Sequence, residues 1–153
     1  MKSALLTACF GFWALIAQAG NGTWTNLNGG SWTNAANWSG GTIADASGST
    51  ANFSTLNLPA DATVTLDTAR TIGNLTFDDQ NSTKHNWFLN AGGAGALTLA
   101  GTTPTITVSS ATTTIALPLA GTASLTKLGS GALVFAVTNA LILSACSPTA
   151  RAT

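Results

Sequence analysis

The chain carries very little charge. Only 7% of its 153 residues are charged, and five Lys or Arg balance five acidic residues, all of which are Asp because Glu is absent. Without a basic cluster to neutralise phosphates, the sequence predicts no nucleic-acid partner. Cytosolic proteins usually carry far more charge. Solubility must rest here on Thr, Ser, Asn and Gly, a composition typical of extracellular β-repeat proteins.

Reactive side chains are scarce as well. The chain has no tyrosine, a single histidine, His85, and two cysteines, Cys9 and Cys146. A catalytic thiol needs a basic partner, and His85 lies far from Cys146 in the sequence. Asp78 and Asp79 are adjacent, whereas a glycosidase acid pair or a cation site needs carboxylates from separate elements, so we expect a solvated turn there. We therefore expect a non-enzymatic protein without metal or cofactor.

No apolar run in the first part of the chain is long enough for a transmembrane helix. The run from Ala4 to Ile16 has 13 residues, against about 20 for a membrane span. Lys2 precedes it, and Ala17-Gln18-Ala19 follows with the small-x-small pattern of a cleavage site. Residues 1–19 are therefore predicted to be a signal peptide. The mature chain is expected to be secreted or at the cell surface, without a membrane span.

The chain does contain a repeated unit: an apolar residue, a small or polar residue, and a second apolar residue. The doublets are Val64/Leu66, Leu75/Phe77, Trp87/Leu89, Leu97/Leu99, Ile106/Val108, Ile115/Leu117 and Leu133/Phe135, with Leu125 and Lys127 in the matching place before the last. Such alternation puts both apolar side chains on one face of a strand. Burial of one doublet stabilises the fold by only about 3–6 kcal/mol, which is less than the entropy cost of ordering about ten residues. The strands must therefore stack on one another.

These patterns predict an all-β protein. The stacked units favour a short parallel β-helix, or solenoid, of about three turns, and an antiparallel β-sandwich is the alternative because strand spacing of 8–12 residues suits it equally. We divide the mature chain into a Trp-rich N-terminal cap (20–60), a β-strand repeat region (61–135) and a disordered tail without repeats (136–153).

Three tryptophans, Trp24, Trp32 and Trp38, precede the repeats in a segment rich in Gly, Asn, Ser and Thr. One interpretation is a cap that seals the apolar end of the stack. The other is a platform for sugars in a carbohydrate-binding module whose partner is a surface polysaccharide, which requires at least two exposed and coplanar rings. The cap is favoured because the three residues have few polar neighbours able to orient a sugar.

The last unit resembles a known repeat. Leu125-Thr126-Lys127-Leu128-Gly129-Ser130-Gly131-Ala132-Leu133 is similar to the Leu-Thr-Lys-x-Gly-x-Gly-x-Leu signature of autotransporter-associated β-strand repeats. Its motif positions are Leu125, Lys127, Gly129, Gly131 and Leu133. The Trp-rich opening and the strands predicted near 62–67 and 70–78 also fit such proteins, so the resemblance covers about residues 20–135.

This resemblance implies a right-handed parallel β-helix that serves as an exported passenger stalk or scaffold at the surface of Gram-negative-type bacteria. The repeat pattern ends after Phe135. Thr138-Asn139 is followed by Ala-Leu-Ile, whereas in the family the unit continues through a turn into another strand. We therefore expect the N-terminal part of a longer protein, truncated or frameshifted. Exposed strand edges at the end of the stack are expected to allow self-association.

Overall fold

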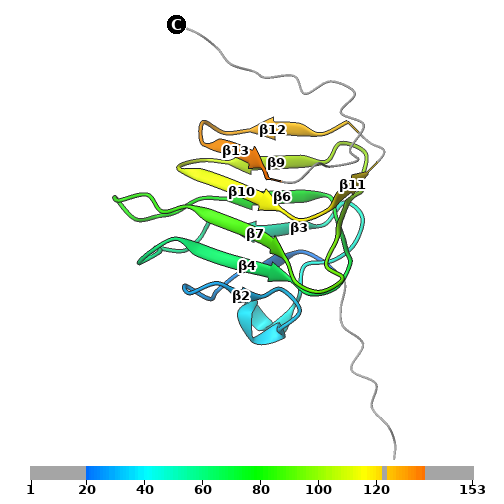
Figure 1. Cartoon of the computed structure of the whole chain (residues 1–153), viewed down its shortest axis with the longest axis horizontal. Coiled ribbons are helices and arrows are strands. Elements are labelled where there is room, and N and C mark those ends of the chain that lie inside the picture. The colour runs from blue at the N-terminus through cyan, green and yellow to red at the C-terminus, as the bar shows by residue number, and fades with distance from the viewer. Residues whose placement is uncertain (1–19, 122–123, 137–153) are drawn as a thin grey trace, which may run out of the picture.

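The chain folds as a short parallel β-solenoid of about four turns (Figure 1). The computed structural model describes residues 20–121 and 124–136. The predicted signal peptide, and the predicted tail apart from Ala136, lie outside these residues. All pairings between the named strands are parallel, so the prediction of a parallel solenoid is confirmed and the sandwich alternative is wrong.

Each full turn contains three short strands, and two 3-10 helices lie near the start of the chain. The elements are β1 (Gly22–Thr23), β2 (Gly30–Ser31), η1 (Ala35–Asn37), η2 (Ser39–Gly41), β3 (Thr50–Phe53), β4 (Ala62–Leu66), β5 (Arg70–Ile72), β6 (Asn74–Phe77), β7 (Trp87–Ala91), β8 (Leu97–Leu99), β9 (Thr105–Val108), β10 (Thr112–Ala116), β11 (Leu119–Gly121), β12 (Thr126–Leu128) and β13 (Ala132–Phe135).

The strands form three sheets that run along the solenoid. Sheet 1 has the order β1-β3-β6-β9-β12, sheet 2 the order β2-β4-β7-β10-β13, and sheet 3 the order β5-β8-β11. Figure 1 shows sheets 1 and 2 as two layers whose strands run in opposite directions, with sheet 3 along one side. The number of apolar doublets predicted about three turns. The structure has about four, because β1 and β2, which lie in the predicted cap, pair with β3 and β4 as a first rung.

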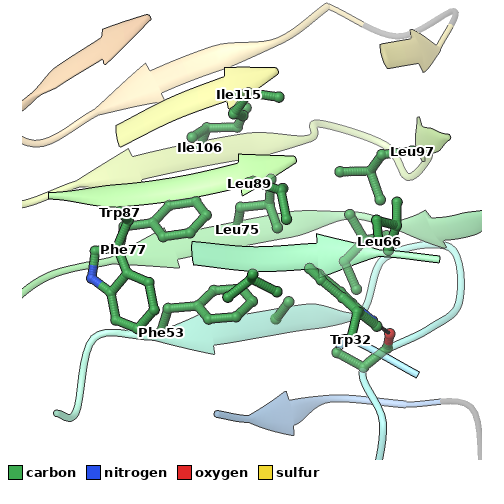
Figure 2. Packing of buried hydrophobic residues seen from close by; sticks show 14 of the residues in the cluster. Trp32, Phe53, Leu66, Leu75, Phe77, Trp87, Leu89, Leu97, Ile106 and Ile115 are labelled. Carbon is green, nitrogen blue, oxygen red and sulfur yellow. Dashed lines mark hydrogen bonds between the residues drawn. The ribbon is translucent and has the colours of Figure 1, made fainter. Parts of the chain in front are cut away.

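The register between rungs keeps like side chains in columns. In sheet 1, Leu75 pairs with Ile106 and Phe77 pairs with Val108. Every predicted doublet from β4 to the corner after β10 is buried: Val64/Leu66, Leu75/Phe77, Trp87/Leu89, Leu97/Leu99, Ile106/Val108 and Ile115/Leu117 (Figure 2). These side chains form one continuous core with the residues of the first rung. The predicted boundary between the cap (20–60) and the repeat region (61–135) therefore does not divide the core.

The end rung is less covered than the others. Leu133 and Phe135 of β13 are half-buried and pack against the core from above. No helix in the described ranges is long and apolar enough to cross a membrane.

Candidate functional site

The three tryptophans of the first turn are buried. Trp24 and Trp32 are 0% exposed, and Trp38 is 2% exposed. Each indole N–H donates to a backbone carbonyl: Trp24 to Asn26 at 2.7 Å, Trp32 to Ala44 at 3.0 Å, and Trp38 to Trp32 at 2.7 Å. A buried indole usually finds such a partner. The rings therefore have neither a free face nor a free polar edge to offer a sugar.

Trp38 is steeply inclined to the other two indole rings. Trp24 meets Trp38 edge to face, with ring centroids 5.0 Å apart and an interplanar angle of 88°. Trp32 meets Trp38 at 5.1 Å and 62°. All three contact Phe53, which stacks on Phe77 at 4.9 Å and 7°. The prediction of an exposed, coplanar platform is wrong for these residues.

Small residues in the first rung explain why the tryptophans lie inside. Gly22 pairs with Ala51 in sheet 1, so this rung places little side-chain volume at that position of the core. A Cβ on Gly22 would lie 2.8 Å from the Trp38 ring, which shows that the indole fills the space that the glycine leaves. Large aromatic side chains thus close the N-terminal end of the core.

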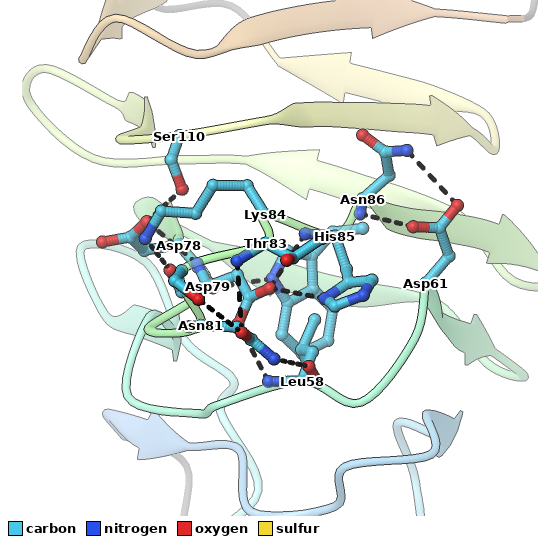
Figure 3. Close-up of polar contacts among 12 residues, drawn as sticks. Leu58, Asp61, Asp78, Asp79, Asn81, Thr83, Lys84, His85, Asn86 and Ser110 are labelled. Carbon is cyan, nitrogen blue, oxygen red and sulfur yellow. Dashed lines mark hydrogen bonds and ion pairs between the residues drawn. The ribbon is translucent and has the colours of Figure 1, made fainter.

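A polar loop between β6 and β7 contains the best-connected ionisable group (Figure 3). Asp79 is 1% exposed. Its Oδ1 accepts the backbone N–H groups of Leu58 at 2.8 Å and Asn81 at 2.9 Å. Its Oδ2 accepts the backbone N–H of His85 at 2.8 Å and lies 2.9 Å from His85 Nδ1. One carboxylate thus accepts backbone hydrogen bonds from three residues in two loops, the β3–β4 loop and the β6–β7 loop.

Two opposing effects act on the pKa of Asp79. Burial disfavours the charged form and raises the pKa, but the backbone N–H groups of Asn81, Leu58 and His85, together with the His85 side chain, stabilise the carboxylate and outweigh burial. The net result lowers the pKa of Asp79 from 3.8 to about 2. The group is therefore an anion at neutral pH, held by donors that are all supplied by the protein.

Neighbouring side chains extend the same network. Asp78 Oδ1 accepts the backbone N–H of Asp79 at 2.8 Å and the Ser110 hydroxyl, and its carbonyl accepts the Trp87 indole N–H at 2.8 Å. Lys84 Nζ donates to the carbonyl of Asp79. The expected solvated turn is thus wrong for Asp79, because the loop folds over it. No sequence spacing signals the pairing of Asp79 with His85, which depends on how the loop closes.

The described residues contain no group of three or more His, Cys, Asp or Glu side chains arranged to hold a metal ion. A shallow pocket of about 200 Å³ opens at the corner between sheets 3 and 1. Its lining is glycine and neutral polar residues: Gly48, Gly73, Asn74, Gly101, Thr102, Thr103 and Pro104. Such a lining offers backbone groups and hydroxyls but no charge to a ligand.

The repeat motif forms the last strand-turn-strand among the described residues. Leu125 is 8% exposed and belongs to the core, whereas Leu133 is half-buried. Lys127, in β12, donates from Nζ to the carbonyl of Gly129 at 2.6 Å. Gly129 has φ +79°, and a Cβ there would lie 2.2 Å from the carbonyl oxygen of Val108.

Gly131 also lies close to the rung below, because a Cβ there would lie 2.7 Å from Val108 Cγ1. Both glycines of the motif thus let the corner lie directly on the rung below. The motif positions run from Leu125, just before β12, through the turn into β13, with only the two glycines in the turn itself.

The chain has no match among protein-family models, curated proteins or solved structures. The resemblance to autotransporter-associated repeats therefore stays a prediction based on the motif at residues 125–133. What the structure establishes is the architecture: three parallel sheets, an aromatic first turn, a β6–β7 loop held by the hydrogen bonds of Asp79, and a C-terminal rung with partly exposed apolar residues.

Proposed function

We propose that this chain is a non-enzymatic structural module, a short stiff segment of an exported scaffold that resembles the passenger stalks of autotransporter-associated repeat proteins. The observation that carries the proposal is the unbroken register of the three parallel sheets over a single core. Backbone ladders and buried apolar columns resist bending together, because each rung is bonded to the rungs above and below it. The described carboxylates of the loop serve this framework, since they accept hydrogen bonds from neighbouring segments.

The outer surface supports an extracellular location. One outward column of sheet 1 consists of Thr50, Asn74, Thr105 and Thr126, paired rung to rung. Thr105 Oγ1 donates to Asn74 Oδ1 at 2.8 Å, so neutral side chains also bond neighbouring rungs on the outside. A surface solvated by hydroxyls and amides rather than charges agrees with the composition and with the predicted signal peptide.

Tryptophan fluorescence tests the scaffold against a carbohydrate-binding module. The four tryptophans after residue 19 are all at most 2% exposed, so we expect blue-shifted emission that acrylamide quenches weakly and that glycans leave unchanged. A Leu27→Trp variant is the control, because Leu27 is 42% exposed and a tryptophan there reports full quenching. Red-shifted emission of the parent chain that responds to one glycan would overturn the proposal in favour of a sugar-binding module.

Export is tested separately. Residues 1–19 fused to a periplasmic reporter enzyme in a Gram-negative host are expected to carry the reporter out of the cytoplasm and to be cleaved after Ala19. A matched fusion with Leu5→Asp and Leu6→Asp, which interrupts the apolar run, is expected to stay inside. Equal retention of both fusions would contradict the exported location while leaving the scaffold architecture untouched.

A further inference from the structure

The C-terminal edge of sheet 2 has backbone groups that point away from the solenoid. Ala132 and Ala136 donate their N–H groups to the carbonyls of Ala111 and Ile115 on the rung below, at 2.9 Å in each case. Backbone groups alternate in direction along a strand, so those of Leu133 and Phe135 point to the opposite side. Among the described residues no strand pairs with β13 on that side.

We propose that a second copy of this chain occupies this edge, with β13 of each copy pairing antiparallel about a two-fold axis at Val134. In this register Leu133 of one copy and Phe135 of the other form a hydrogen-bonded pair, and each pair exchanges both of its N–H···O=C bonds. The edge presents donors and acceptors in alternation, which another strand edge matches and a flat apolar ligand does not.

The side chains favour the same arrangement. Leu133 and Phe135 are half-buried, and the register sets them opposite one another on the inner face, where each gains apolar cover. On the outer face the two copies of Val134, which is 44% exposed, meet as the close non-hydrogen-bonded pair. The chain has a formal net charge of zero, so no long-range repulsion opposes the approach of two copies.

The association is closed rather than filamentous because the two ends of the solenoid differ. At the N-terminal end of sheet 2 the carbonyl of Ser31 accepts Asn37 Nδ2 at 2.8 Å and the backbone N–H of Asn34 at 3.3 Å. Figure 1 shows the short helical segment lying beneath β2. A two-fold contact between like edges uses the same patch on both copies and therefore stops at a dimer.

The strand beside β13 limits the contact. Lys127 stands in an inward column of β12 at the end of sheet 1, and an inward-pointing charge is a device that discourages strand addition. The joint therefore runs through β13 alone. This inference depends on the geometry of the edge and not on export, so it can fail without affecting the proposed function.

Light scattering of the purified chain, measured over a range of concentrations, tests the dimer. We expect a concentration-dependent mass that levels off at twice that of one chain. Val134→Lys places two ammonium groups opposite each other and is expected to weaken the dimer at least tenfold. Leu27→Lys removes an equally exposed apolar residue far from the edge and is expected to leave the dimer intact. A monomer at all concentrations, growth beyond a dimer, or equal weakening by both variants would overturn the proposal.

Amide hydrogen exchange of the unaltered chain gives a second test that needs no variant. The second copy predicts that the amides of Leu133 and Phe135 become protected as the concentration rises. Protection that is already complete in a monomer would assign the edge to residues 137–153 of the same chain and would refute the dimer. Absence of protection at every concentration would refute it as well.

Discussion

Lys127 lies directly above Ile106 in the same inward-facing column of sheet 1. Below them the column continues through Leu75 and Ala51. The Lys127 ammonium donates to the carbonyls of Gly129 at 2.6 Å and Leu128 at 3.3 Å. A charged side chain thus ends a column that apolar side chains fill in the three rungs below.

Replacing this lysine is expected to increase self-association. In Lys127→Leu the column stays apolar up to the edge of β12, so that strand gains a surface able to add another strand. We expect the apparent dissociation constant measured by light scattering to fall about tenfold, which corresponds to about 1.4 kcal/mol. Lys127→Arg keeps the charge and is the control. Unchanged association of the leucine variant would show that Lys127 does not prevent strand addition at the edge of β12.

The buried carboxylate of the loop is expected to matter for stability. Asp79→Asn puts an N–H₂ group where an oxygen accepts backbone N–H groups, so at least one buried donor loses its acceptor. The expected loss in the free energy of unfolding is about 1–3 kcal/mol. Asp61→Asn is the matched control, because Asp61 is exposed: asparagine retains the bond from the Asn86 backbone N–H at Oδ1 and loses only the exposed 3.3 Å bond from Asn86 Nδ2. Urea unfolding measures both, and equal effects would contradict the structural role of Asp79.

The lowered pKa of Asp79 also predicts acid sensitivity. The unfolded carboxyl, with a pKa near 3.8, takes up its proton before the folded one, with a pKa of about 2. The stabilisation by Asp79 is therefore complete above about pH 5 and is lost as the pH falls through about 2. Thermal unfolding between pH 5 and pH 2 measures this loss. The Asp79→Asn variant should show a smaller dependence over this range, and an unchanged dependence would refute the assignment.

Phe53 is the centre of the aromatic first turn, since it contacts all three tryptophans and stacks on Phe77. Phe53→Ala opens a cavity that these rigid rings cannot close, and the expected cost is about 3–5 kcal/mol. Phe135→Ala, at the half-buried end rung, is the control and is expected to cost about 1–2 kcal/mol. Chemical unfolding at low protein concentration compares the two, and a smaller effect at Phe53 would contradict its central place in the core.

The turn of the repeat motif gives a test based on backbone geometry. Gly129 and Gly40 both have positive φ, at +79° and +62°, so alanine is strained at either position. Only at Gly129 does the added Cβ also strike backbone, 2.2 Å from the oxygen of Val108, whereas Gly40 has open space. We expect Gly129→Ala to cost roughly 1–3 kcal/mol more than Gly40→Ala in unfolding free energy. Equal losses would indicate that the corner does not lie against the rung below.

The apolar doublets made the strands and their inward faces predictable. Val64/Leu66 and Leu75/Phe77 alternate with polar residues, and this period of two assigns each side chain to a face before any partner is known. The number of turns was less predictable, because the first rung is built from Gly22 and Gly30, whose sequence carries no apolar alternation. The sequence favoured a cap over a sugar platform at the three tryptophans, and the burial of each ring became evident only in the fold, since a local sequence does not reveal which side of a ring will be covered.

The stack of β units follows from the amino-acid sequence alone, because no doublet buries enough surface to fold without neighbours and the alternation leaves only one face for the core. The contacts between distant segments, in contrast, depend on the complete fold. Asp79 meets Leu58 across 21 residues, and its pKa falls because three backbone N–H groups converge on it after the loops have closed. Hydrogen bonds between rungs depend on loop length and register, and neither is encoded within any single unit.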